Sequence, residues 1–154
     1  MTLLSLRNRQ RTRCVDLRLL RKITVVCLKE IFAQSKFELG IHLVSAREMA
    51  EVNENFLQHS GSTDVITFDY TGTETLHGEI FISIDDAVSQ AKEFGTTWQS
   101  ELVRYVVHGI LHLRGFDDLN PVARKKMKRK ENRVVSELSL RFPLSKLQRS
   151  SKKK

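Results

Sequence analysis

Two histidines and an aspartate near residue 110 have the spacing of a metal site. His108 and His112 are four residues apart, so both imidazoles leave the same face of a helix. Gly115 can adopt the left-handed conformation that ends a helix, and Asp118 follows three residues later, where its carboxylate could reach the same point. Two imidazoles and a carboxylate with a fourth position open are typical of catalytic zinc. Iron, manganese and nickel accept the same ligand types.

The residue that follows the first histidine limits the kind of hydrolysis that the site could catalyse. The spacing is similar to the HExxHxxGxxH signature of metzincin proteases, in which a Glu follows the first His and activates zinc-bound water. Gly109 stands at that position here, so peptide hydrolysis would lack its general base. The pattern therefore favours a metal-dependent hydrolase other than a protease. Asp117 is a further candidate ligand, but its spacing places it on a different side of the turn from Asp118.

A helix packed on a sheet is required to position these residues. Hydrophobic periodicity and capping residues predict five helices and four strands. We expect helices at 15–33, 45–56, 85–94 (capped by Asp85 or Asp86), 97–113 and 121–140, and strands at 2–8, 37–43, 65–68 and 80–84. The last two strands are close enough to form an antiparallel hairpin with a turn at 71–74. The order predicts an α+β fold: one small mixed β-sheet packed with about five helices, the metal-site helix central.

The length of 154 residues suits one domain. Pro143 is expected to end the ordered structure, which gives a domain at 1–143 and a basic, disordered tail at 144–154. Residues 59–62 are expected to form a polar loop. Cys14 and Cys27 lie in a segment expected to be helical, and we expect them to be buried or idle thiols in a reducing cytosol. No apolar run approaches the ~18 residues of a membrane span, and the N-terminus does not have the order of a secretory signal. We therefore expect a cytoplasmic protein without a membrane partner.

Charge is segregated along the chain, whose formal net charge is +8. Residues 1–29 and 124–154 are strongly basic, whereas residues 30–123 are acidic. If the first and last helices pack side by side, their cations form a basic wall that would bind phosphates next to an acidic metal site. Alternatively, these cations are only solvated helix faces. The cations of the two helices are Arg18, Arg21, Lys22, Arg124, Lys125, Lys126, Lys128, Arg129, Lys130 and Arg133.

The segment from His108 to Asp118 resembles the motif HGxLHLxGYDH of the YbeY endoribonucleases, also called ribosomal RNA maturation factors. Three further family motifs occur in the same order: PTDVLSF at Ser62–Phe68, GDIxIS at Gly78–Ser83 and QAxEFG at Gln90–Gly95. Their order and spacing hold over residues 53–118, and a weaker similarity covers residues 1–140. Four ordered motifs are far more specific than the histidine pair alone.

The resemblance implies a zinc-dependent, single-strand-specific endoribonuclease that acts in ribosome biogenesis, chiefly in maturation of the 3′ end of 16S rRNA. Its partner would be RNA, chiefly rRNA or the small ribosomal subunit, and no DNA is expected. One Zn²⁺ per chain would be bound by His108, His112 and Asp118, with other divalent metals not excluded. The catalytic base is not identified by the sequence.

Four other residues are candidates to contact the substrate or to support the metal ligands. Arg104 lies one helical turn before His108, and Thr63, Asp64 and Ser83 lie in the shared motifs. Each also has a structural interpretation. Arg104 could form a surface pair with Glu101, and the other three could serve as a strand-end hydrogen bond, a turn or cap, and strand packing, respectively.

Two positions depart from the family pattern. Asp118 replaces the usual third histidine; a carboxylate can bind zinc, but its negative charge would make a bound water less acidic. Leu57 stands where the family usually has an Arg that faces the substrate. These departures leave room for an alternative function: an RNA- or ribosome-binding assembly factor with a structural metal and little nuclease activity.

Overall fold

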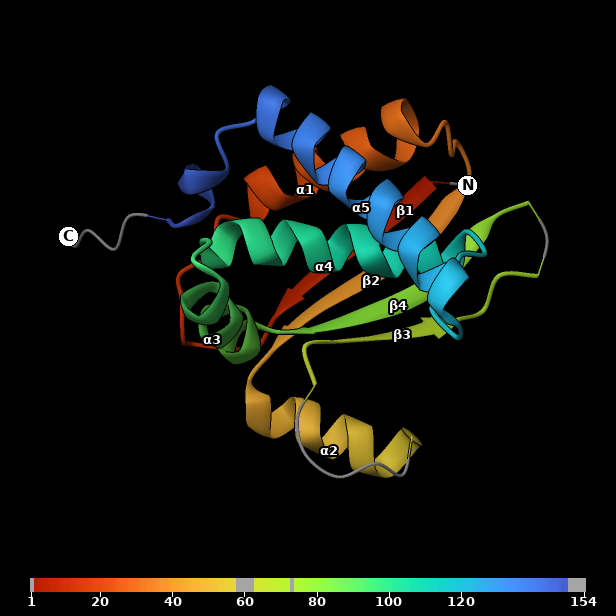
Figure 1. Ribbon diagram of the computed structural model, residues 1–154. Coiled ribbons are helices and arrows are strands. Elements are labelled where there is room, and N and C mark those ends of the chain that lie inside the picture. The colour runs from red at the N-terminus through yellow and green to blue at the C-terminus, as the bar shows by residue number, and fades with distance from the viewer. Residues whose placement is uncertain (1, 58–62, 73, 150–154) are drawn as a thin grey trace.

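A four-stranded mixed β-sheet forms the centre of the computed structural model, which describes residues 2–57, 63–72 and 74–149 (Figure 1). The strand order is β1 (Thr2–Asn8), β2 (Phe37–Val44), β4 (Leu76–Ser83) and β3 (Val65–Asp69). The first three strands are parallel, and β3 pairs antiparallel with β4. The predicted hairpin and mixed sheet are therefore confirmed.

Helices cover both faces of the sheet (Figure 1). On one face lie α1 (Leu17–Val26), α4 (Trp98–Leu113) and α5 (Pro121–Arg141), and their apolar sides form the main core with the sheet. On the other face, α2 (Ala46–Leu57) packs over a smaller apolar cluster, and α3 (Ile84–Phe94) lies at one end. The predicted α+β fold, with about five helices and a central metal-site helix, is confirmed.

The close approach of α4 to the sheet depends on a glycine. A Cβ atom added at Gly109 would lie 2.5 Å from Cδ1 of Ile80 on β4, well inside van der Waals contact. Thr97 caps the N-terminus of α4, where its side chain accepts a hydrogen bond from the Ser100 amide. Any side chain at position 109 would point into the sheet. The glycine at position 109, where metzincins have a glutamate, thus allows the close packing of α4 on the sheet.

Three local features differ from the predictions. The cap of α3 is Ser83, whose hydroxyl accepts a hydrogen bond from the Asp86 amide, so the helix begins before Asp85. Asp85 instead accepts hydrogen bonds from the Ala46 amide at the start of α2 and from the hydroxyl of Thr12. The helix predicted at 15–33 is α1 followed by one π-helical turn, η1 (Cys27–Ile31).

The ordered structure extends past Pro143, contrary to the prediction of a disordered tail from residue 144. A 3₁₀ turn, η2 (Leu144–Leu147), follows, and Leu147 is buried in the core. Backbone hydrogen bonds join Asp16 to Leu147 and Arg149 to Cys14. The buried Leu147 explains why the chain does not separate from the domain here. Residues 150–154 and the predicted loop at 59–62 lie outside the described residues.

Cys14 is exposed and Cys27 is buried, and both are free thiols. Cys14 precedes α1 rather than lying in it. In the described parts of the chain, no helix has both the length and the apolar character needed to cross a bilayer.

Candidate metal centre

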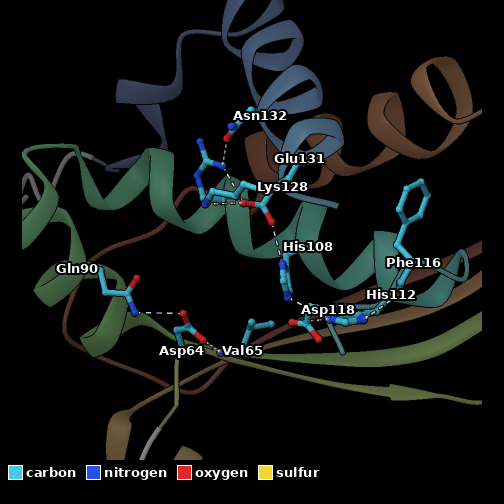
Figure 2. A network of polar contacts seen from close by, with 11 residues as sticks. Asp64, Val65, Gln90, His108, His112, Phe116, Asp118, Lys128, Glu131 and Asn132 are labelled. Atoms are coloured by element: carbon cyan, nitrogen blue, oxygen red, sulfur yellow. Dashed lines mark hydrogen bonds and ion pairs between the residues drawn. The ribbon is translucent and has the colours of Figure 1, made fainter. Parts of the chain in front are cut away.

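The side chains of His108, His112 and Asp118 converge beside the C-terminal end of α4 (Figure 2). The two Nε2 atoms are 3.1 Å apart, and Nε2 of His112 is 4.0 Å from Oδ2 of Asp118. One ligand atom from each residue lies within 4.8 Å of the other two. Gly115, with a φ of 98°, ends the helix and turns the chain, so that Asp118 returns toward the histidines. The structure thus brings together the three residues predicted as ligands.

A hydrogen bond made by Nδ1 of each imidazole determines which ring nitrogen carries the proton. Nδ1 of His108 donates to Oε1 of Glu131 at 2.8 Å, and Nδ1 of His112 donates to the backbone oxygen of Phe116 at 3.1 Å. Because both partners can only accept, each Nδ1 carries the proton and each Nε2 keeps its lone pair. Two lone pairs that face each other at this distance are well suited to a shared cation. The residues present therefore fit a divalent metal.

The charge state of His112 agrees with this arrangement. Burial, helped by the nearby His108, lowers the pKa of the His112 imidazole below its ordinary value of 6.5. The neutral form, which is the form that binds metals, is therefore favoured near neutral pH.

Glu131 on α5 completes the centre and was not predicted from the sequence. The residue is only 3% exposed, and its carboxylate accepts from Arg104 at 2.7 Å as well as from His108. Burial by itself raises the pKa of this carboxyl group, but the hydrogen bonds from His108 and Arg104 outweigh burial and hold the pKa below 4.5. The carboxylate is thus ionised and orients the His108 ring.

A signal for Glu131 was present in the sequence. Met127, Glu131, Val134 and Leu138 recur at helical spacing and are all buried on one face of α5. A glutamate on an apolar stripe must have a partner, because an unpaired buried charge is costly. The sequence could show that Glu131 needs a partner, but it could not show which residue of another helix supplies it.

Arg104 lies on the polar side of α4 but does not form the pair with Glu101 that was considered from the sequence. Its guanidinium donates to Glu131 and, at 2.7 Å, to Oδ1 of Asn132. Glu101 instead accepts a hydrogen bond from Thr96 at 2.8 Å. Arg104 therefore contacts the group that orients His108.

The three candidates from the other shared motifs lie further along the same side of the molecule. Asp64 accepts hydrogen bonds from the Val65 amide at 2.8 Å and from the Gln90 side chain at 3.1 Å (Figure 2). Thr63 precedes it and is half-buried, and Ser83 is fully buried as the cap of α3. None of the three belongs to the convergent ligand group.

A groove of about 840 Å³ begins at the metal centre. One wall comes from α5, the floor from α4 and the opposite wall from α3 together with Asp64. A smaller hollow of about 270 Å³ lies between β3 and the two histidines. The centre is consequently open to ligands on two sides. Residues that line the larger groove include Asp64, Gln90, Phe94, Arg104, Tyr105, His108, Asp118, Arg124, Lys125 and Lys128.

The other histidines that the structure describes lie apart from the centre. His42 and His77 are on strands, where they pair with Glu79 and Glu38. His59 lies outside the described residues, as does the side chain of Leu57. Asp117 is exposed and accepts a hydrogen bond from the Leu119 amide, away from the ligand group as predicted.

Comparison with known proteins matches this architecture to one family. The solution structure of TM1509 from Thermotoga maritima aligns with a TM-score of 0.70 at 25% sequence identity, covering 99% of both chains. The chain is 37% identical to a protein named endoribonuclease YbeY from Parabacteroides distasonis, over 73% of this chain and 79% of that protein. Its identity to the protein of the same name from Phocaeicola vulgatus is 37%, over 78% of this chain and 89% of that protein. The family model described as endoribonuclease YbeY matches residues 5–139, and the chain belongs to this family.

Proposed function

We propose that this protein is a metal-dependent endoribonuclease that cleaves single-stranded RNA and acts in ribosomal RNA maturation, chiefly at the 3′ end of the small-subunit RNA. The observation that carries the proposal is the convergence of three ligand side chains at the end of an open groove. Family membership and the names of the relatives support the reaction class.

The ligand set supports one divalent ion per chain, and we propose Zn²⁺ because two imidazoles and a carboxylate form a known type of catalytic zinc site. His108, His112 and Asp118 would hold such an ion, which would supply a Lewis acid for a phosphoryl oxygen and would lower the pKa of a water molecule. Glu131 and the Phe116 carbonyl orient the two rings through their Nδ1 protons.

Cations on α5 support RNA as the substrate. Arg124, Lys125 and Lys128 line the groove that begins at the ligand group, where they are placed to attract phosphates. Arg104 is held by Glu131 and Asn132, so we assign it a role in positioning rather than in direct phosphate binding. With ribosomal RNA as the substrate, the proposed location is the cytoplasm.

A second candidate function is an RNA- or ribosome-binding assembly factor with little nuclease activity. Two observations favour it: Asp118 adds negative charge to the ligand group, and Leu57 replaces the family's usual cation. Both changes would weaken phosphodiester cleavage without removing the basic groove.

The test is cleavage of a defined single-stranded RNA by purified, metal-loaded protein. Under our proposal the wild type cleaves, a chelator abolishes cleavage, and His108→Ala removes activity while the protein remains folded. His77→Ala is the matched control, because His77 is on β4 outside the ligand group. Tight RNA binding without cleavage above background would favour the assembly factor.

Metal content tests the site separately from the activity. Elemental analysis is expected to give about one metal ion per chain. Asp118→Ala should lower metal affinity, whereas Asp118→His should bind zinc at least as tightly as the wild type. An unchanged affinity in Asp118→Ala would refute the assignment of Asp118 as a ligand.

A further inference from the structure

An exposed aromatic ring lies on the rim of the groove, away from the metal ligands. Phe94 is the last residue of α3, and 64% of its surface is accessible. It lines the groove that also contains His108 and Asp118. Gly95 ends the helix directly after it in the left-handed conformation, which fixes where the ring leaves the chain. An exposed aromatic ring at a groove offers a face on which the base of a single strand can stack.

The floor of the groove contains a buried hydroxyl group, that of Tyr105. Tyr105 is 96% buried on α4, since only 4% of its surface is accessible, and its hydroxyl has no hydrogen-bond partner among the residues that the structure describes. A buried hydroxyl without a partner costs free energy, which a polar atom supplied from the groove would recover. Tyr105 precedes His108 by three residues, so it lies about one helical turn from the metal ligands.

The wall opposite Phe94 is basic. Arg124, Lys125 and Lys128 on α5 line it, and Arg124 donates to the backbone oxygen of Asp118. The groove therefore combines an aromatic ring, a buried donor and a row of cations. Proteins that bind single-stranded nucleic acid use the same combination, with bases stacked on aromatic rings and phosphates held by Lys and Arg.

We infer that the groove is a nucleotide subsite: the base of one nucleotide of the bound single strand stacks on Phe94, the Tyr105 hydroxyl donates to that nucleotide, and the α5 cations hold the phosphates of the strand. This inference rests on the proposed function, because RNA is the ligand. It also supplies a physical reason for single-strand preference, since a paired base is already stacked in its duplex and cannot cover the ring.

The experiment measures binding of a short single-stranded RNA to metal-free protein, in which cleavage does not interfere, by fluorescence anisotropy. Phe94→Ala should weaken binding about 5- to 160-fold, which corresponds to the loss of one stacked base. Phe94→Trp should restore it. The matched control is Phe56→Ala, because Phe56 is 69% exposed but lies on α2, outside the groove.

Abasic substitution distinguishes stacking from a general loss of structure. Removal of the base at one position of the RNA should weaken wild-type binding, and the same removal should have no effect on Phe94→Ala. Tyr105→Phe should weaken binding about 3- to 10-fold without loss of folding stability. The inference is overturned if Phe94→Ala binds like Phe56→Ala, or if its loss is the same for intact and abasic RNA. An unchanged affinity in Tyr105→Phe would refute the role of the hydroxyl.

Cleavage assays run in parallel separate this inference from the proposed function. Wild-type cleavage combined with Phe94-independent binding would refute the subsite and leave the nuclease. Binding that depends on Phe94 without any cleavage would support the subsite and refute the nuclease. A wild type that does not bind single-stranded RNA would refute both.

Discussion

At the residue scale, Glu131 connects the candidate metal ligands on and after α4 to α5. Its two oxygens accept hydrogen bonds from different residues. Oε1 accepts from His108, and Oε2 accepts from Arg104 and lies 3.5 Å from Nζ of Lys128. A buried carboxylate with this many charged donors is held in one geometry. The orientation of the His108 ring therefore depends on α5 as much as on α4.

Loss of the Glu131 charge should weaken metal binding. Glu131→Gln keeps the size of the side chain but makes it a poorer acceptor for the His108 proton, so we expect metal affinity to fall about 10- to 100-fold. Competition with a chromophoric chelator measures this change. Glu137→Gln is the control, because Glu137 is an exposed glutamate on the same helix that pairs with Arg141. Equal affinities in the two variants would contradict the role of Glu131.

The same carboxylate predicts how acid affects the metal-free protein. The pKa of Glu131 lies below 4.5 in the folded state, so the unfolded state binds more protons in this range. Its stabilising contribution is therefore fully present above about pH 4.5 and is lost as the pH falls through the folded pKa. Thermal unfolding measured across this range should show the difference between wild type and Glu131→Gln shrinking only below about pH 4.5. A difference that shrinks well above that pH would count against this explanation.

At the scale of elements, the sequence predicted most of the helices and strands that carry the site residues. It did not predict the contacts that join one element to another. The periodicity of α4 and its Thr97 cap were local signals, and both were predicted correctly. The cap of α3 was assigned to Asp85 or Asp86 because carboxylates are common there. The structure instead uses Ser83 and directs Asp85 to the start of α2. Tertiary contacts of this kind are not encoded in the local pattern.

The π-helical turn and Glu131 illustrate the same limit. The helix predicted at 15–33 was correct in its apolar face, but η1 (Cys27–Ile31) changes its hydrogen-bond spacing within an unbroken pattern. The convergence of His108, His112 and Asp118 was predictable because all three residues lie within one helix and its following turn. The partner of His108 was not, because it comes from α5 and depends on how two helices pack.

The contact between α4 and β4 predicts an effect of substitution at Gly109. In Gly109→Ala the new methyl group would overlap Ile80, so α4 must move from the sheet and the protein should lose about 1–3 kcal/mol of stability. The intrinsic helix preference of Ala, up to about 1 kcal/mol, acts in the opposite direction.

Urea unfolding of single and double variants isolates the overlap. Ile80→Ala removes all three atoms that crowd position 109, so Gly109→Ala should cost less in that background than in the wild type. Metal affinity should fall with the single glycine change, because the helix that bears His108 and His112 is displaced. Additive effects of the two substitutions would show that the two sites do not contact.

At the scale of the whole molecule, the structure shows where the basic segments of the sequence lie. The basic ends of the chain form helices on the same face of the sheet as α4 (Figure 1). Among the described cations of these two helices, however, those that line the groove come from α5, while Arg21 on α1 donates to the backbone oxygen of Leu4. The basic wall considered from the sequence is thus lined by one helix rather than two.

This placement predicts an unequal salt dependence of RNA binding. Each phosphate neutralised in a single strand contributes about −0.7 to the slope of log K against log salt concentration. Replacing Lys125 and Lys128 with Gln should therefore reduce the slope by about 1.4 in magnitude and weaken binding of metal-free protein at low salt. Replacing Arg18 and Lys22 on α1 with Gln removes the same charge outside the groove and should leave the slope unchanged. Equal losses in the two double variants would mean that RNA is attracted by net charge and not by the groove.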